Sequence, residues 1–127
     1  MRLLLDTHTL AWWAEGSSEL PPTARQAIDG RANNVFVSAV TAYELALKHR
    51  MGKWPEAAAL LAELDRLPAL GFGMLPLNIA HARVAGALPP VHRDPFDRML
   101  AAQALVEDLT IVSVDDKLNQ FGVKRLW

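Results

Sequence analysis

Two carboxylates of this sequence each follow a run of apolar residues. Asp6 comes directly after the run LLL at residues 3–5, and Asp115 follows the apolar segment 110–114. Continuous apolar runs of this kind are typical of strands that are buried on both faces of a parallel sheet. Parallel strands end at the same edge of a sheet, which is the edge where ligands bind, so we expect both carboxylates to emerge there.

Two further acids are expected near that edge. Glu44 stands about one helical turn beyond the apolar segment 35–38, and its side chain can point back toward the strand ends. Asp97 stands in the first turn of a helix that Asp94-Pro95 opens, with an N-cap residue followed by proline at the first helical position. A right-handed crossover brings the start of this helix to the same edge. The four acids predicted to converge are Asp6, Glu44, Asp97 and Asp115.

Convergence of four carboxylates has a chemical consequence. Within ~6 Å of one another and without a counter-ion, they would raise each other's pKa and destabilise the fold, so the group makes physical sense chiefly as a cation site. The chain has no cysteine, which leaves oxygen or imidazole as metal ligands. Oxygen ligands suit Mg²⁺ or Mn²⁺. Such an ion can generate a hydroxide nucleophile from bound water and neutralise charge on a phosphate.

Each of these acids also has a purely structural interpretation. Asp6 could begin a turn, and Asp97 could complement the N-terminus of its helix. Asp115 or Asp116 could cap a short helix at residues 117–121. Glu44 could be an exposed helical acid that pairs with Lys48 four residues later. These alternatives stay open for each residue taken singly, and only the joint placement favours a cation site.

Basic and imidazole side chains are candidates for supporting roles. Phosphate backbone would be held by cations in loops near the acids; the candidates are Lys48, Arg50, Lys53, Arg93, Arg98 and Lys117. His8 could be a general base, although a metal-bound water needs none. The other histidines, His49, His81 and His92, show no ligand spacing such as i, i+4 on one helix.

The elements that must position these residues alternate along the chain. We expect strands at residues 3–5, 35–37 and 110–114, with weaker ones at 73–75 and 123–126. Helices are expected at residues 8–14, 23–29, 40–49, 56–67, 78–87 and 95–108. This alternation predicts an α/β fold, with a parallel sheet of about five strands flanked by helices.

Length and composition set the outer bounds. With 127 residues, 51% of them apolar and 21% charged, the chain is predicted to form a single globular domain over residues 1–127. The apolar runs are too short to cross a membrane, and neither a signal peptide nor a disulfide framework is evident, so we expect a cytoplasmic protein. The net charge of −1 means that a nucleic acid would bind a local basic rim.

Four segments resemble the PIN domain family, and within it the VapC-type toxins of bacterial toxin–antitoxin pairs. These segments are LLLDTHTLAWW, VSAVTAYELALK, RDPFDRMLAAQA and TIVSVDDKLNQFGVKRLW, and with the chain between them the resemblance covers almost the whole sequence. It implies a parallel sheet flanked by helices, Mg²⁺- or Mn²⁺-dependent endoribonuclease activity, and two partners: a second copy of the chain and a cognate antitoxin that blocks the site.

The resemblance also implies roles for individual residues. Asp6, Glu44, Asp97 and Asp115 are the expected acidic quartet. Hydrogen bonds from Ser38, Ser113 and Thr7 are expected to support them, and Asp94 is expected nearby. Asp115 and Asp116 differ by one position, so a slip of the strand register would exchange them.

Other α/β proteins with acidic sites match less well. A receiver-type, Mg²⁺-binding signalling domain normally has two adjacent acids after its first strand, whereas Asp6 is followed by Thr7 and His8. A phosphatase that forms an aspartyl-phosphate would need an aspartate where His8 stands, and no glycine-rich phosphate loop is present. A PIN fold retained as a binding module with weak or no turnover remains a second hypothesis.

Overall fold

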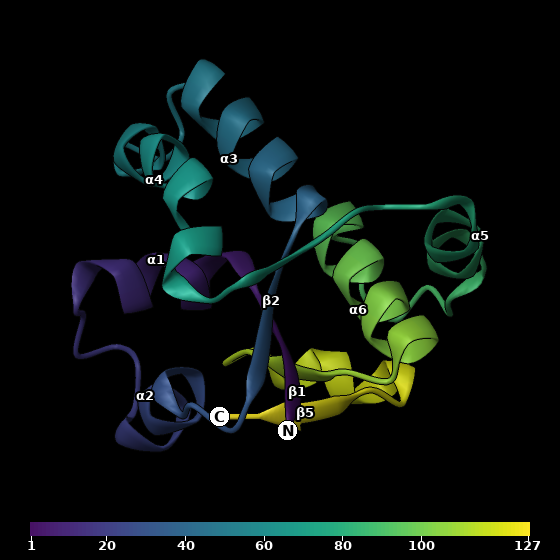
Figure 1. Ribbon diagram of the computed structural model, residues 1–127. Helices are drawn as coiled ribbons and strands as arrows, with labels where there is room; N and C mark the ends of the chain where they lie inside the picture. Colours follow the sequence, from purple (N-terminus) through teal and green to yellow (C-terminus); the bar gives the residue numbers. More distant parts are fainter.

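The computed structural model describes all residues, 1–127, and contains one five-stranded parallel sheet (Figure 1). Its strands lie in the order β3-β2-β1-β4-β5, so β1 is central. They are β1 (Arg2–Leu5), β2 (Asn34–Ser38), β3 (Gly73–Leu75), β4 (Thr110–Val112) and β5 (Lys124–Leu126). The predicted α/β class and the five predicted strands are therefore confirmed.

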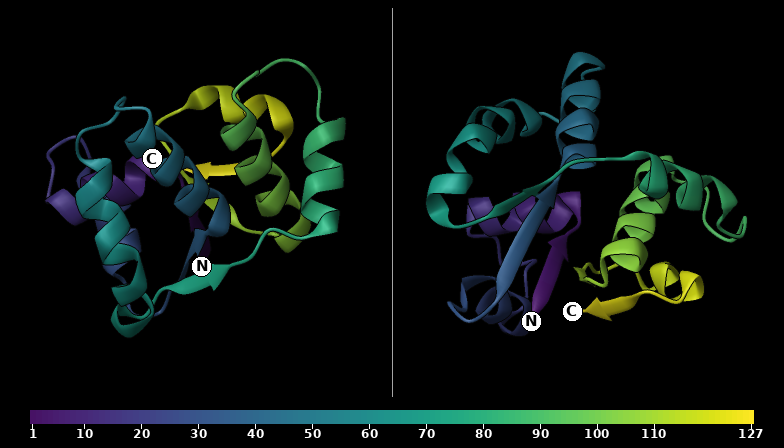
Figure 2. Two further views of the ribbon diagram at one scale, coloured as in Figure 1. Left: turned by 90° about the horizontal axis from the view of Figure 1, so that it is seen from above. Right: turned by 45° about the vertical axis from the view of Figure 1, so that its right-hand side comes forward.

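Helices connect and cover these strands. The α-helices are α1 (Thr7–Glu15), α2 (Pro22–Asp29), α3 (Ala39–Arg50), α4 (Ala57–Glu63), α5 (Ile79–Ala87) and α6 (Pro95–Glu107). Three short 3₁₀-helices are η1 (Leu64–Arg66), η2 (Pro68–Leu70) and η3 (Asp116–Phe121). Helices α1 and α2 lie on one side of the sheet and α6 on the other, with α5 beside α6 (Figures 1 and 2). None of the helices combines the length and the apolar character that crossing a membrane requires.

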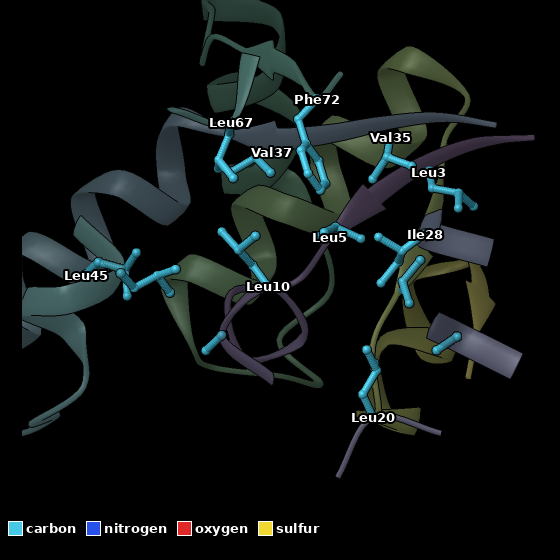
Figure 3. Packing of buried hydrophobic residues seen from close by; sticks show 14 of the residues in the cluster. Leu3, Leu5, Leu10, Leu20, Ile28, Val35, Val37, Leu45, Leu67 and Phe72 are labelled. Carbon is cyan, nitrogen blue, oxygen red and sulfur yellow. The ribbon is translucent and has the colours of Figure 1, made fainter. Parts of the chain in front are cut away.

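The central strand shows how the sequence produces this layering. Successive side chains of a strand point to opposite faces. Leu3 and Leu5 accordingly pack in one core with Leu10 of α1 and Ile28 of α2, as Figure 3 shows. Leu4 points the other way, into a second core that contains buried residues of α6 and η3. Burial on both faces explains why the strand is a continuous apolar run.

Most predicted boundaries agree with the structure to within one residue, and two elements end earlier than expected. The helix expected over residues 56–67 ends as an α-helix at Glu63 and continues as 3₁₀ turns toward Pro68, whose ring cannot donate a backbone hydrogen bond. The strand expected to reach residue 114 ends at Val112, and Val114 is 50% exposed. Ser113 ends it because its hydroxyl accepts the Asp115 N–H at 3.1 Å and so turns the chain. The short helix expected at 117–121 is the 3₁₀-helix η3.

Candidate metal centre

The carboxyl ends of β1 and β4 and the first turn of α6 surround one pocket of about 340 Å³. Five of the acids considered above line it: Asp6, Glu44, Asp94, Asp97 and Asp115. Lys48 is the single Lys or Arg among the lining residues. The predicted convergence of acids from distant segments is therefore present in the structure.

Asp6 is buried where β1 passes into α1. It is 7% exposed, and its Oδ1 accepts hydrogen bonds from the backbone N–H groups of His8 at 2.7 Å and Thr9 at 3.5 Å. The Ser113 hydroxyl donates to the other oxygen at 2.6 Å. Burial raises the pKa of Asp6, while the hydrogen bonds from Ser113 and the backbone act in the opposite direction. Asp6 thus caps a helix and also lines the pocket.

The surroundings of Asp97 oppose its ionisation. Asp94 caps α6 by accepting the N–H groups of Phe96 at 2.8 Å and Asp97 at 3.2 Å, which sets Asp97 in the first helical turn. Burial raises the pKa of Asp97 to about 7, helped by repulsion from Asp94, Asp6 and Asp115 and opposed by His92. A cation among these carboxylates would remove that repulsion.

Asp115 and Asp116 face different surroundings. Asp115 lines the pocket, and its Oδ1 caps η3 by accepting the Lys117 N–H at 3.0 Å. Asp116 is exposed and is not among the lining residues. The structure therefore has the register that we expected, in which Asp115 faces the other acids.

Glu44 is not the exposed helical acid that its spacing to Lys48 would suggest. It does pair with Lys48, whose Nζ lies 2.5 Å from Oε2, but Glu44 is 4% exposed and so is not a surface acid. The ammonium group of Lys48 also lies over the rings of Trp54 and Phe96, at 5.5 and 6.0 Å from their centroids. Lys48 is thus the local counter-ion of a buried carboxylate.

Spacing along the sequence missed His92. Its Nε2 lies 2.9 Å from Oδ2 of Asp97 and 2.9 Å from Oδ2 of Asp115. These three atoms belong to a cluster whose ligand atoms all lie within 4.8 Å of one another. His92 lies in the loop before α6. The path of this loop, and not a periodic spacing along a helix, brings it to the acids. Its place two residues before the Asp94 cap was the available signal.

The predicted supporting hydrogen bonds are only partly present. Ser113 contacts both Asp6 and the backbone of Asp115, as described above. The Ser38 hydroxyl instead donates to Gln103 Oε1 at 2.5 Å and accepts the Val40 N–H at 2.9 Å, so it contacts none of the acids. Thr7 pairs with the Thr41 hydroxyl at 3.1 Å. Ser38 and Thr7 therefore fix α3 and α1 rather than the carboxylates.

The candidate RNA-binding cations also divide into groups. The prediction that Arg98 contacts phosphate is wrong. Its guanidinium donates to four backbone carbonyls and is therefore engaged within the fold; these carbonyls belong to Ala85, Leu88, Pro89 and His92. Lys48 is paired with Glu44. The remaining candidates, Arg50, Lys53, Arg93 and Lys117, are exposed.

The donor set fits a hard divalent cation. The pocket offers carboxylate oxygens from several elements and contains no sulfur ligand. Burial raises the pKa of Asp6, and burial together with repulsion from neighbouring carboxylates raises that of Asp97. Mg²⁺ and Mn²⁺ prefer such oxygen ligands. Their binding would offset the repulsion that the fold otherwise leaves uncompensated.

Solved structures with the same fold span nearly the whole chain. VapBC2 from Rickettsia felis, bound to a DNA fragment from its promoter, aligns with a TM-score of 0.72 and 15% identity, covering 99% of this chain and 98% of the other. FitAcB from Neisseria gonorrhoeae gives a TM-score of 0.71 at 20% identity, with 98% and 96% covered. VapBC-5 from Mycobacterium tuberculosis, a member of the VapBC family of toxin–antitoxin systems, gives 0.60 at 21% identity, with 98% of each chain covered.

Sequence comparison adds the family. A search of curated protein sequences finds no match. The sequence pattern that defines the PIN domain matches residues 3–124, which include all four acids of the expected quartet. Together with the parallel sheet and the acid-lined pocket at its edge, this match shows that the chain belongs to the PIN domain family.

Proposed function

We propose that this protein is a Mg²⁺- or Mn²⁺-dependent endoribonuclease that acts as the toxin of a toxin–antitoxin pair. The observation that supports this best is the pocket in which Asp6, Glu44, Asp97 and Asp115 meet, with the pKa of Asp97 raised to about 7. A protein has little reason to hold such a cluster of acids unless a cation completes it. Membership of the PIN domain family is in line with a nuclease.

The acids have different roles in this proposal. Asp6 and Asp97 would hold the ion directly, and Glu44 and Asp115 would complete its surroundings through water or a second ion. When bound, the ion supplies Lewis acidity, which activates water for attack on a phosphodiester and offsets charge on the phosphate. Ser113 keeps the Asp6 carboxylate oriented by donating to its Oδ2. No residue of the chain forms a covalent bond to the substrate in this scheme.

The substrate proposed is RNA held by its backbone. The exposed cations Arg50, Lys53, Arg93 and Lys117 can contact phosphates, which would give binding that weakens as salt rises. Lys48 lies at the pocket itself and could meet a phosphate only by exchanging part of its contact with Glu44.

The proposed partners are a cognate antitoxin and a second copy of the chain. Support for the antitoxin comes from the structures with the same fold, which are VapBC and FitAcB assemblies. We propose that the antitoxin blocks the acidic pocket and that the toxin forms a homodimer. Co-purification of the chain with the product of a neighbouring short reading frame would test the first of these statements.

Cleavage of labelled RNA by purified protein tests the activity. We expect cleavage that requires Mg²⁺ or Mn²⁺ and falls at least about 100-fold in Asp6→Asn and Asp97→Asn, because each removes a charged ligand. Asp116→Asn is the matched control and should keep near-normal cleavage, since Asp116 lies outside the pocket. Equal cleavage by the wild type and Asp6→Asn would reveal a contaminating nuclease. RNA and metal binding without any cleavage would favour a PIN fold that only binds.

A further inference from the structure

His92 connects two acids of the pocket that come from different elements. Asp97 belongs to the first turn of α6, whereas Asp115 follows β4 and caps η3. The Nε2 atom of His92 lies 2.9 Å from one oxygen of each carboxylate. An ionised carboxylate oxygen only accepts hydrogen bonds, so Nε2 is the donor to Oδ2 of Asp115. One imidazole nitrogen therefore makes a hydrogen bond to Asp115 and a close polar contact with Asp97.

The imidazole ring is itself held in place. It stacks on Phe121, with the ring planes 4° apart and the centroids 6.2 Å apart, and its side chain is 12% exposed. Arg98 fixes the loop that carries it, because its guanidinium donates to the carbonyl of His92 and to three other carbonyls. Because Phe121 holds the ring and Arg98 holds the backbone, the imidazole can set the position of the groups that it contacts.

The contacts leave one oxygen available on Asp97. His92 meets Oδ2 of Asp97 and Oδ2 of Asp115, while the backbone N–H of Lys117 donates to Oδ1 of Asp115. Oδ1 of Asp97 takes part in no hydrogen bond or ion pair of the structure. His92 is not among the residues that line the pocket, although both of its acidic partners are. The imidazole therefore contacts the carboxylates without occupying the pocket.

We propose that His92 is a positioning residue of the metal centre: it ties Asp97 to Asp115 and leaves the other oxygen of Asp97 for the ion. This inference rests on the proposed metal site and assigns to that site a residue outside the acidic quartet. Groups that orient metal ligands in this way commonly change metal affinity 10- to 100-fold when they are removed.

Mn²⁺ binding to the intact protein, measured by calorimetry, tests this role. His92→Ala should raise the Kd for Mn²⁺ at least about 10-fold. His92→Gln should keep the Kd within about threefold of the wild type, because its amide N–H₂ reaches nearly as far as Nε2 and donates in the same way. His92→Asn, whose amide is shorter, should resemble the alanine variant. His49→Ala, which removes an exposed histidine at the end of α3, is the matched control.

Two further measurements separate the possible outcomes. Circular dichroism checks that each variant is folded. If His92→Ala disturbs the loop, comparing the Kd of His92→Gln with that of His92→Asn still tests the role of the donor group. Pulsed electron paramagnetic resonance of Mn²⁺ in ¹⁵N-histidine protein should show no directly bound nitrogen. A directly bound nitrogen that disappears in His92→Ala would overturn the inference, because His92 would then be a ligand.

The failure of this inference can be distinguished from failure of the proposed function. If the wild type binds no Mn²⁺ at millimolar concentration, the metal site is refuted and the role of His92 with it. If the wild type binds Mn²⁺ and His92→Ala binds it equally well or more tightly, His92 does not position the acids, and the proposed nuclease stands.

Discussion

Two polar clusters lie at the carboxyl edge of the sheet, one of them centred on a buried amide and the other on a group of carboxylates. Beyond β2 and β3, Gln103 of α6 accepts a hydrogen bond from Ser38 and donates to the Pro76 carbonyl at 3.2 Å. His81, which caps α5 together with Asn78, lies 3.5 Å from the same amide. Beyond β1 and β4, the pocket collects carboxylates.

The two clusters differ in how far their polar groups are hydrogen-bonded or charge-balanced within the protein. The amide cluster consists of hydroxyl, amide and imidazole groups. Of its buried side-chain atoms only Nε2 of His81, which lies 3.7 Å from a carboxylate oxygen of Glu107, has no hydrogen-bond partner. Such networks fix the relative position of the elements that they join. The acidic cluster instead holds more negative charge than Lys48 and His92 can balance. Polar groups that bond mainly to one another serve the fold, whereas an excess of like charge indicates a ligand.

Removing the centre of the amide cluster should have the largest effect on stability. Gln103→Leu leaves the buried Ser38 hydroxyl without its acceptor and the Pro76 carbonyl without its donor, which should lower the free energy of unfolding by about 2–3 kcal/mol. Chemical denaturation would measure the loss. Gln26→Leu, at an exposed position of α2, is the control. A large loss of Mn²⁺ affinity in folded Gln103→Leu would contradict the separation of the two clusters.

In the acidic cluster, removing a side chain should increase the free energy of unfolding of the metal-free protein. Because the folded-state pKa of Asp97 lies near 7, above its ordinary value, ionisation costs stability as pH rises from about 4 to 7. Without divalent ions, Asp97→Asn should therefore be more stable than the wild type by about 2 kcal/mol at pH 8, and the gain should vanish near pH 4. Thermal melts at both pH values measure the difference. Saturating Mn²⁺ should reverse the order at pH 8, and a wild type that stays less stable with the ion present would contradict a cation site.

Ser113 lies at the boundary between fold and site, and its effect should be the smallest. Ser113→Ala removes the donor to Asp6 and the acceptor of the Asp115 N–H, which should cost about 1 kcal/mol of stability at neutral pH. The loss should be accompanied by several-fold weaker Mn²⁺ binding, measured by the same calorimetry. Ser18→Ala, at an exposed position, should change neither quantity.

The sequence predicted those parts of the molecule that follow from local pattern and chain direction. Apolar runs at β1 and β4, and the Asp94-Pro95 cap of α6, were sufficient to place three acids at one edge. Parallel strands and right-handed crossovers then leave few alternatives. Burial of Glu44 agreed with its apolar neighbours, yet the spacing to Lys48 could not show that the pair lies inside the protein.

Contacts that depend on the path of a loop could not be predicted in this way. The loop before α6 contains two prolines and has no period, so nothing in its spacing indicated that His92 meets Asp115, 23 residues later. Arg98 was mistaken for a surface cation because its four carbonyl partners belong to that loop and to the end of α5. Ser38 ends its strand as expected, but its partner Gln103 lies 65 residues away.

The central place of β1 determines when the site can exist during synthesis. Asp6 leaves the ribosome 107 residues before its partner Ser113. Until β4 joins β1, the emerging polypeptide has neither Asp115 nor the hydroxyl that orients Asp6. The proposed nuclease therefore cannot cleave RNA beside its own ribosome until β4, Ser113 and Asp115 have been translated.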